Sequence, residues 1–447
     1  MIWVTLSACL GAVLVVFDST LINAVFPAAL KALGRDMATT SWLINASNSA
    51  LATGLLVAGG LAETFGYRRM YVVGTLLFGV ASAASVIAPG FWTLLALRVA
   101  IGAAGAVLMV CSLALIAEVV PSERRSSAIG LYGALSGLGS VLGPLAGAFV
   151  LARSSWQVSF LFTTAGAIAT LALIHRFMPR SSAPRAGGRV DWITGMAGGA
   201  ALCLLVLGLS RSAQADASRA SVWTAICAAG VAGAFALMRE LRSRAPLFPA
   251  ALRTPGYGHA LLLILALSIC FGTVLFAVPL FTTTVQGKST VAAGLTLVPA
   301  AVLSIIGALV GGRLARASFS LPAGLGLALA LLAVFVMSGW NEQTSVAAVW
   351  ICTGISGFGL GMGIPSAAGY ALQQAGSSSG TGSAWYQTFR QVGIVTGVAI
   401  FAATVPQRFA LDVPLLWVGS ICAALGVLWM FGTLLLRRAA YASASPQ

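Results

Sequence analysis

The sequence has few charged residues, and acids are especially rare. Charged side chains make up 8% of the 447 residues, with ten acids against 25 bases. Soluble domains usually carry about 25% charged residues, so this chain lacks the charge needed to cover a water-facing surface. Hydrophobic residues make up 59%, and the mean hydropathy is +0.97. The composition excludes an ordinary soluble protein and predicts an all-α polytopic membrane protein.

Residue groups that carry enzyme chemistry are also missing. The seven cysteines lie singly in apolar segments without C-x-x-C spacing, and the two histidines are far apart. We expect small buried cysteines, no disulfide and no metal site. Gly287-Lys288-Ser289 resembles the end of a phosphate-binding loop, but Thr282 stands where that motif needs glycine. The scarcity of histidines and acids argues against an enzyme, and no cofactor is expected.

The excess of bases fits a membrane topology better than a nucleic-acid site. With a cytoplasmic N-terminus, sixteen bases fall in inner loops and the tail, seven in outer loops, and Arg98 and Arg390 within spans. Lys and Arg favour cytoplasmic loops. Met1-Ile2-Trp3 has no basic residue, and the apolar run after it is too long for a cleavable signal peptide. We expect a multi-pass protein of the cytoplasmic (inner) membrane, with both termini cytoplasmic and no nucleic-acid partner.

Fourteen apolar segments are long enough to be membrane helices. They cover residues 2–26, 41–62, 70–88, 91–117, 126–150, 156–178, 192–210, 221–238, 258–283, 291–312, 320–338, 345–370, 386–404 and 413–436. Basic linkers after the sixth and eighth segments divide the chain. We expect an N-terminal six-helix bundle (1–178), linkers with an inserted helix pair (179–256), a C-terminal six-helix bundle (257–438) and a short cytoplasmic tail (439–447). Parallel repeats characterise a large class of transporters.

A carboxylate interrupts the first apolar segment. Asp18 is the only charged residue between Ile2 and Phe26. An acid in the middle of a membrane helix raises the insertion free energy by about 2.5–3.5 kcal/mol. Such groups usually face a cavity or an internal partner and mark function. Asp18 is therefore a candidate proton carrier, with an outer-interface cap or anchor as the alternative.

Two arginines lie inside predicted spans. Arg98 lies roughly a third of the way in from the outer side. A guanidinium stays charged at ordinary pH, so it needs an anion or water, and Asp18 is the expected partner. Arg390 lies just inside the inner end of segment 386–404, where snorkelling to the interface is an equally good interpretation.

Polar and small residues mark other helix faces. Asn45 and Asn48 share a face of segment 41–62, where they line a cavity or bond a neighbouring helix. Residues 59–69 predict a tight cytoplasmic turn.

Glycines spaced four apart in segment 126–150 allow close packing, and Pro144 permits a bend. Together they suggest a hinge or seal, with simple packing as the alternative. Segment 345–370 is too glycine-rich to be rigid, and residues 376–382 predict a flexible connector.

Together these motifs resemble the fourteen-helix drug:proton antiporters of the major facilitator superfamily, over nearly the whole chain. The resembling motifs are Phe17 to Asn23 with Pro27, residues 59–69, Arg98 with Gly102, Gly139 to Gly147, Asp191-Trp192 with Gly195, Glu240 to Arg253 with Pro246-Leu247, and Arg390-Gln391-Val392-Gly393 with Gly397. The chain departs from the family where Glu63-Thr64 replaces an Asp followed by Arg, and where Tyr67 replaces a base.

The resemblance implies two six-helix bundles that rock around a central cavity, with Asp18 and Arg98 as the proton-coupling pair. Candidate cavity residues are Asn45, Asn48, Tyr386, Gln387 and Arg390. Candidate gating residues are Gly59, Glu63, Gly66, Arg68, Arg69, Gly139, Gly143, Pro144 and Gly147.

The expected function is proton-coupled export of a small organic compound, such as a drug, toxic compound or antibiotic-like metabolite, with the proton gradient as energy source. The scarcity of acids in the spans favours neutral, anionic or monocationic aromatic cargo. Export of a specific endogenous metabolite, amino acid or siderophore is the alternative on the same fold. A membrane-embedded enzyme or a scaffold is less favoured. We expect a monomer in the lipid bilayer, with a periplasmic adaptor as an option in a Gram-negative host.

Overall fold

The computed structural model describes residues 2–34, 37–179, 192–212, 219–242, 255–375, 379–404, 415–416 and 418–428, and these are almost entirely helical. The main helices are α1 (Ile2–Leu33), α2 (Met37–Phe65), α3 (Tyr67–Val86), α4 (Phe91–Val119), α5 (Ser122–Leu151), α6 (Ser159–Phe177), α7 (Trp192–Ser212), α8 (Arg219–Arg242), α9 (Pro255–Leu280), α10 (Thr290–Leu295), α11 (Val298–Leu314), α12 (Ser320–Met337), α13 (Val346–Ala375) and α14 (Ser379–Thr404). A single-turn helix η1 (Trp156–Val158), a π-helical turn η3 (Phe281–Val285) and a last helix (Val418–Leu428) complete them. Most of both linkers (180–191 and 243–254) and the tail at 439–447 lie outside the described residues.

Most of these helices have the length and apolarity of membrane spans. Nine helices in the described part of the chain are long and apolar enough to cross a membrane. Shorter apolar helices occur at Ile193–Leu205, Cys227–Ala236 and Val418–Leu428. The protein is therefore a multi-pass helical membrane protein.

Two helix boundaries differ from those expected. Segment 291–312 is divided into α10 and α11, with a turn at Thr296 and Leu297 between them. Helix α14 begins at Ser379, inside the stretch expected to be a flexible connector. The early start has a physical cause described below, because α2 and α3 supply hydrogen-bond acceptors to the first turn of α14.

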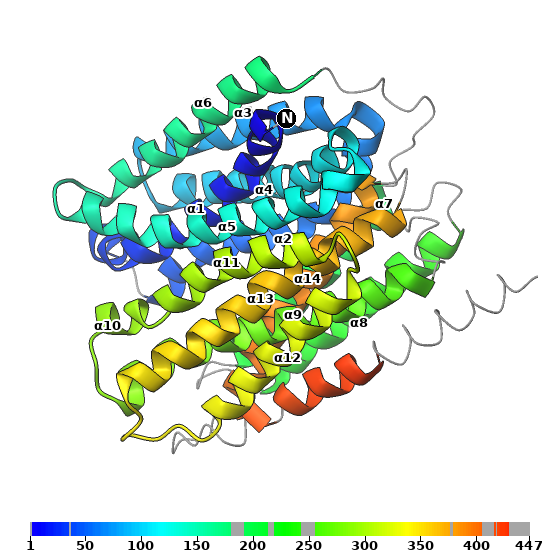
Figure 1. Ribbon diagram of the computed structural model, residues 1–447. Helices are drawn as coiled ribbons and strands as arrows, with labels where there is room; N and C mark the ends of the chain where they lie inside the picture. Colours follow the sequence, from blue (N-terminus) through cyan, green and yellow to red (C-terminus); the bar gives the residue numbers. More distant parts are fainter. Residues whose placement is uncertain are drawn as a thin grey trace, which may run out of the picture.

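The helices pack in two groups that lie side by side (Figure 1). In the first group, α1 packs on α4, α5 and α6, while α4 also contacts α2 and α3. In the second group, α13 packs on α9, α11 and α12, and α9 packs on α14. The groups meet where α5 contacts α11 and α13, and where α14 contacts α2 and α4.

The pair α7 and α8 covers the junction of α2 with α14. Helix α7 contacts both of those helices, and α8 packs on α7. The Thr53 hydroxyl donates a hydrogen bond to the Gly199 carbonyl, with 3.3 Å between the oxygens. A Cβ atom on Gly199 would collide with the Thr53 backbone, so the glycine allows this close approach.

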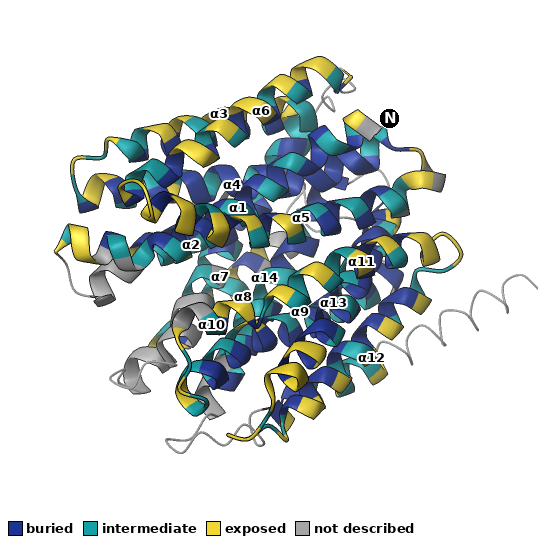
Figure 2. Ribbon diagram, turned by 60° about the vertical axis from the view of Figure 1, so that its left-hand side comes forward, coloured by how far each residue is buried: buried dark blue, intermediate teal, exposed yellow. Residues whose placement is uncertain are grey.

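Apolar side chains cover the outside as well as the core. Large exposed hydrophobic residues include Val80, Leu145, Ile168, Val336 and Ile351. Figure 2 shows such exposed positions along the outer faces of helices such as α3, α6 and α12, while α4 and α9 are mainly buried. An apolar exterior of this kind suits lipid.

The cysteines are mostly buried, with two exceptions. Cys203 on α7 is partly accessible and Cys227 on α8 is exposed. Burial was expected for all seven. The expectation is wrong for Cys227 because α8 packs on α7 and leaves its other face uncovered. No metal-binding cluster occurs among the residues described.

Candidate functional site

An ion pair inside the first helix group joins α1 to α4. The Arg98 Nη1 atom lies 2.8 Å from Asp18 Oδ2, and both side chains are buried, with 1% and 2% exposure. Arg98 Nε also donates to the Leu43 carbonyl on α2 at 3.2 Å. Asp18 therefore lies in the interior of the first helix group, and the structure brings together the two residues expected to pair.

The second carboxylate oxygen of Asp18 is left open. Oδ1 is buried and accepts no hydrogen bond within the described residues. Burial favours the neutral form of a carboxyl group, whereas a neighbouring cation favours the charged form. Arg98 therefore binds one oxygen of the carboxyl group, and the other oxygen has no partner among the described residues.

Small residues let four helices, α1, α2, α4 and α5, pack closely around this ion pair. A Cβ on Gly143 would collide with the Thr20 hydroxyl of α1, and one on Gly102 would collide with the Ser47 carbonyl of α2. Gly139 and Gly147 lie on the same face of α5 and also approach α1. The glycine face of segment 126–150 thus packs on the helix that carries Asp18.

Pro144 lies inside α5 but is exposed, on a different face from the glycines at Gly139, Gly143 and Gly147. Its position allows a bend in α5. The role of these four residues in gating stays a prediction.

The turn between α2 and α3 holds the start of α14; we call this end of the molecule the α2–α3 end. Glu63 Oε1 accepts hydrogen bonds from the backbone N–H of Thr381 at 3.0 Å and from its hydroxyl at 2.9 Å. The Tyr67 hydroxyl oxygen accepts bonds from the Gly380 N–H and the Ser379 hydroxyl, both at 3.2 Å. Free N–H groups at a helix start favour such acceptors.

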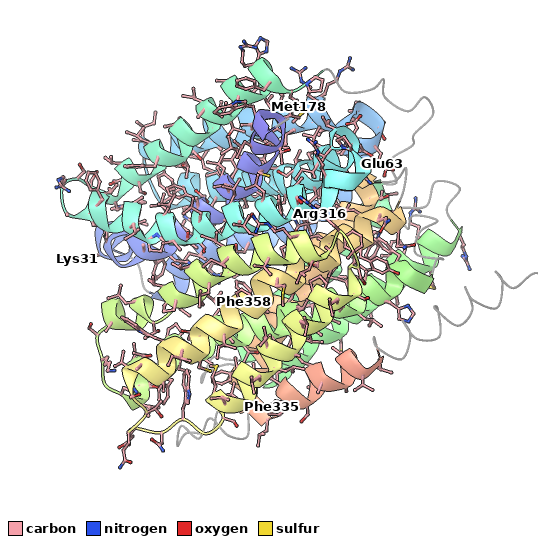
Figure 3. All side chains as sticks on the ribbon, in the orientation of Figure 1. Lys31, Glu63, Met178, Arg316, Phe335 and Phe358 are labelled. Carbon is pink, nitrogen blue, oxygen red and sulfur yellow. The ribbon has the colours of Figure 1, made fainter. Side chains whose placement is uncertain are left out.

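Further contacts join the two helix groups at the same end. Arg316, at the end of α11, donates from Nε and Nη2 to the Ser127 hydroxyl at 3.1 and 2.8 Å. A Cβ on Gly59 would lie 2.7 Å from the Ala384 Cβ. Figure 3 shows Glu63 and Arg316 toward one end of the bundle and Lys31 at the other. The α2–α3 end is closed by these contacts.

Of the predicted gating residues at this end, some make contacts between the helix groups and others do not. Gly59 and Glu63 make contacts between the helix groups, and Gly66 takes a positive φ of 89° at the turn. Arg68 is partly buried and Arg69 is exposed, and neither forms an ion pair with Glu63 in the described part of the chain.

A second polar cluster lies deeper, between α5 and α14. Gln387 Nε2 donates to the Tyr132 hydroxyl at 3.0 Å, and Tyr386 is buried beside them. Arg390 is partly buried and follows Tyr386 and Gln387 by one helical turn on α14. Tyr132 was missed in the sequence because a tyrosine in an apolar segment carries no signal of its own.

The asparagines expected in the same cavity lie at another depth. Asn45 and Asn48 are partly buried on α2. The contact of Glu63 on α2 with Thr381 on α14 gives a common reference level. At 1.5 Å per residue, Asn48 lies about 22 Å from this level along α2, and Arg390 lies about 14 Å from it along α14. The structure therefore joins Tyr386, Gln387 and Arg390 to Tyr132, but does not place the asparagines in that cluster.

Comparison with known proteins identifies the family. The family model described as Major Facilitator Superfamily matches residues 8–398. The chain belongs to the major facilitator superfamily. It is 28% identical to the methylenomycin A resistance protein of Bacillus subtilis (strain 168), over 88% of this chain and 84% of that protein. It is 27% identical to the tetracenomycin C resistance and export protein of Streptomyces glaucescens, over 91% of this chain and 76% of that protein.

Solved structures agree on the fold. The crystal structure of the human organic anion transporter MFSD10 (TETRAN) matches with a TM-score of 0.72 at 16% identity, covering 96% of this chain and 99% of that one. The chain is therefore a helical membrane transporter of the major facilitator fold and not an enzyme. Members of this superfamily move small molecules. The ion pair of Asp18 with Arg98 and the polar cluster around Gln387 are the candidate functional sites of this transporter.

Proposed function

We propose that this transporter is a proton-coupled antiporter that exports a small organic compound across the cytoplasmic membrane by alternating access. The observation that carries the proposal is the buried pair of Asp18 and Arg98, in which one carboxylate oxygen binds the guanidinium and the other is open. Ionisable pairs inside membrane helices mark proton and substrate pathways. An ion pair that only held α1 and α4 together would not require a carboxylate oxygen without a hydrogen-bond partner.

The proposed cycle uses the charge of Asp18. Water at the outer mouth delivers a proton to Oδ1, which neutralises the carboxyl group and weakens its bond to Arg98. Loss of that bond frees α1 and α4 to move relative to one another, and the α2–α3 end opens. Exposure to the cytoplasm then favours the charged form, the proton leaves, and the pair with Arg98 forms again.

The same proposal sets the topology. The α2–α3 end faces the cytoplasm, both termini are cytoplasmic, and fourteen helices cross the membrane as two six-helix bundles with α7 and α8 inserted between them. The basic residues in the loops of that end support this orientation. Contacts of Glu63, Tyr67 and Arg316 close the cytoplasmic side, so the form described is the outward-facing one. A monomer provides both bundles, and no adaptor is needed for the cycle itself.

A single proton suffices for useful export. One charge that moves down about 100 mV supplies roughly 2.3 kcal/mol. Since 1.4 kcal/mol corresponds to a factor of ten, this supports a concentration ratio of about 50-fold. The proton gradient is therefore the energy source, and no cofactor takes part.

The relatives support an antibiotic or drug as cargo. Their printed names concern methylenomycin A resistance and tetracenomycin C resistance and export. A compound made by the host itself is the second candidate, because one of these names includes export. A susceptibility panel on cells with and without the gene separates a broad drug exporter from a transporter of one compound.

The test uses Asp18→Asn in proteoliposomes, with a cationic dye (rhodamine 123) and an anionic dye (fluorescein) assayed separately. The wild-type protein is expected to move at least one of the two dyes uphill when an inward proton gradient is imposed. The variant should lose this uphill transport by about tenfold or more, because its side chain binds no proton. Uphill transport by Asp18→Asn at the wild-type rate would contradict the proposal, as would wild-type protein that moves neither dye against a gradient.

Removing one partner leaves Arg98 buried without a counter-ion, which destabilises proteins by about 3–5 kcal/mol. The double variant Asp18→Asn with Arg98→Gln removes both charges and is expected to fold while still lacking proton coupling. Glu342→Gln serves as the matched control, because it removes an exposed carboxylate far from the pair.

A further inference from the structure

Arg390 is a permanent cation with no counter-ion among the residues that the structure describes. It lies on α14 about 16 Å from the start of that helix, at eleven residues and 1.5 Å per residue. It was expected just inside the inner end of its span, where its side chain could snorkel to the interface. Helix α14 begins seven residues before the predicted span, so Arg390 lies about three turns from the start of the helix and is partly buried.

The described residues supply no anion at this depth. Arg390 forms neither an ion pair nor a hydrogen bond with any of them. After Glu240 the sequence holds two acids, Glu342 in an exposed turn and Asp412 outside the described residues. Glu63 is bonded to the first turn of α14, nine residues before Arg390.

The other arginine inside the helix bundle, Arg98, has a counter-ion. Arg98 is bonded to Asp18, so that carboxylate is already neutralised by its own cation. Tyr132 precedes Gly143 by eleven residues on α5, and Gly143 packs against Thr20, two residues from Asp18, which places the two levels about 16 Å apart along α5. Among the described residues, the interior therefore holds one paired site and one unpaired positive site, which are separate.

The groups around Arg390 suit an oxyanion. Tyr386 and Gln387 lie four and three residues before Arg390 on α14, so they share its helix face, and Gln387 is bonded to the Tyr132 hydroxyl. A tyrosine hydroxyl can donate to a negatively charged oxygen. Gln387 fixes the Tyr132 hydroxyl by donating to its oxygen, which leaves the hydroxyl hydrogen available for a ligand. Arg390 remains partly accessible, so a ligand can reach it.

From this arrangement we infer that Arg390, with the Tyr132 and Tyr386 hydroxyls, binds the acidic group of the cargo, which is an organic anion bearing a carboxylate or a phenolate. A guanidinium binds such oxygens with strong charge-assisted hydrogen bonds. A cationic cargo would meet an uncompensated positive charge here. The inference rests on the proposed export function and names the chemical class of its substrate.

The test is dye binding to the purified full-length protein in detergent, followed by fluorescence anisotropy. Fluorescein is the anionic probe, and rhodamine 123 is a cationic probe built on the same ring system. The wild-type protein should bind fluorescein, and Arg390→Gln should raise its Kd by roughly tenfold or more, since a hydrogen bond to a charged group is lost. Arg390→Lys should recover most of the affinity, while Tyr132→Phe should show a smaller loss.

Arg153→Gln is the matched control, because Arg153 is an exposed cation that lies over the Phe149 ring. It should leave fluorescein binding unchanged. Size-exclusion profiles establish that each variant is folded.

Failure of this inference is separable from failure of the export function. No binding of fluorescein by the wild-type protein, or binding by Arg390→Gln within twofold of wild type, overturns the anion site. Proton-driven transport of rhodamine 123 in proteoliposomes would still support export in that case. A loss of binding equal for both dyes in Arg390→Gln also overturns the inference, because a general packing defect has that effect.

Discussion

At the scale of single residues, Tyr71 is bonded into the backbone of α1. Its hydroxyl accepts a hydrogen bond from the Gly11 N–H at 2.6 Å and donates to the Ser7 carbonyl at 3.0 Å. Ser7 and Gly11 are four apart, so the hydroxyl bridges the groups that pair in an uninterrupted helix. Side chains inserted in this way bend helices. Asp18 lies two turns further along, so Tyr71 contributes to its position.

We expect Tyr71→Phe to destabilise the protein by roughly 1–3 kcal/mol, because the buried Gly11 N–H loses its 2.6 Å partner. Thermal unfolding in detergent should show a lower midpoint. Tyr370→Phe is the control, since the Tyr370 hydroxyl forms no hydrogen bond with the described residues and little should change. Equal midpoints for the two variants would contradict the role given to the Tyr71 hydroxyl.

The sequence predicted some of these residue contacts and missed others. The pairing of Asp18 with Arg98 was predictable because each is the lone charge of its segment and each needs an opposite charge. The contacts of Tyr71 and Tyr132 were not predictable, since one bonds backbone atoms and the other an amide more than 250 positions away. Such partners depend on how helices face one another, which hydropathy leaves undetermined.

At the scale of helices, glycines determine how α13 packs. The glycine-rich segment 345–370 was expected to lack rigidity, but α13 is one continuous helix from Val346 to Ala375. A Cβ on Gly357 would collide with Ala300, and a Cβ on Gly361 with the Ser304 backbone, both on α11. The glycines therefore bring helix backbones together, and their conformational freedom is not what the fold uses.

We expect Gly357→Ala combined with Gly361→Ala to destabilise the protein by about 1–3 kcal/mol or more, because each added methyl group forces α13 away from α11. Chemical or thermal unfolding of purified protein measures the change. Gly258→Ala is the control: it lies in α9 with open space at its Cβ and should be neutral or slightly stabilising. Normal stability of the double variant would show that α11 and α13 tolerate a wider separation.

The existence of the helices was predictable, whereas their docking was not. Long apolar runs gave α4, α9 and α12 close to their observed bounds. The start of α14 was missed by seven residues, because its first turn contains glycine and serine and is held by Glu63 and Tyr67. The docking of α7 on α2 and α14 depends on the contact of Gly199 with Thr53, which small-residue patterns alone do not single out.

At the scale of the whole molecule, the contacts at the α2–α3 end join the two helix groups. Glu63 and Tyr67 come from the first helix group and bind the start of α14 in the second. The departure of this chain from the family motif at Tyr67 therefore has a structural consequence, because a hydroxyl oxygen accepts from N–H groups and a basic side chain has no acceptor. The neutral hydroxyl of Tyr67 and the charged carboxylate of Glu63 therefore stabilise this closed end together.

We expect Glu63→Ala with Tyr67→Phe to shift the resting population toward the form open at the α2–α3 end, because four hydrogen bonds to the start of α14 are lost. Loss of about 1.4 kcal/mol changes the ratio of the two states tenfold. Hydrogen exchange by mass spectrometry should become faster at residues 379–384 and slower at the opposite end, near α10, as that end closes. Ser338→Ala, at a partly exposed position of that opposite end, is the control and should change neither region. Faster exchange at the start of α14 alone would show local fraying of that helix and would contradict a coupled movement of the two helix groups.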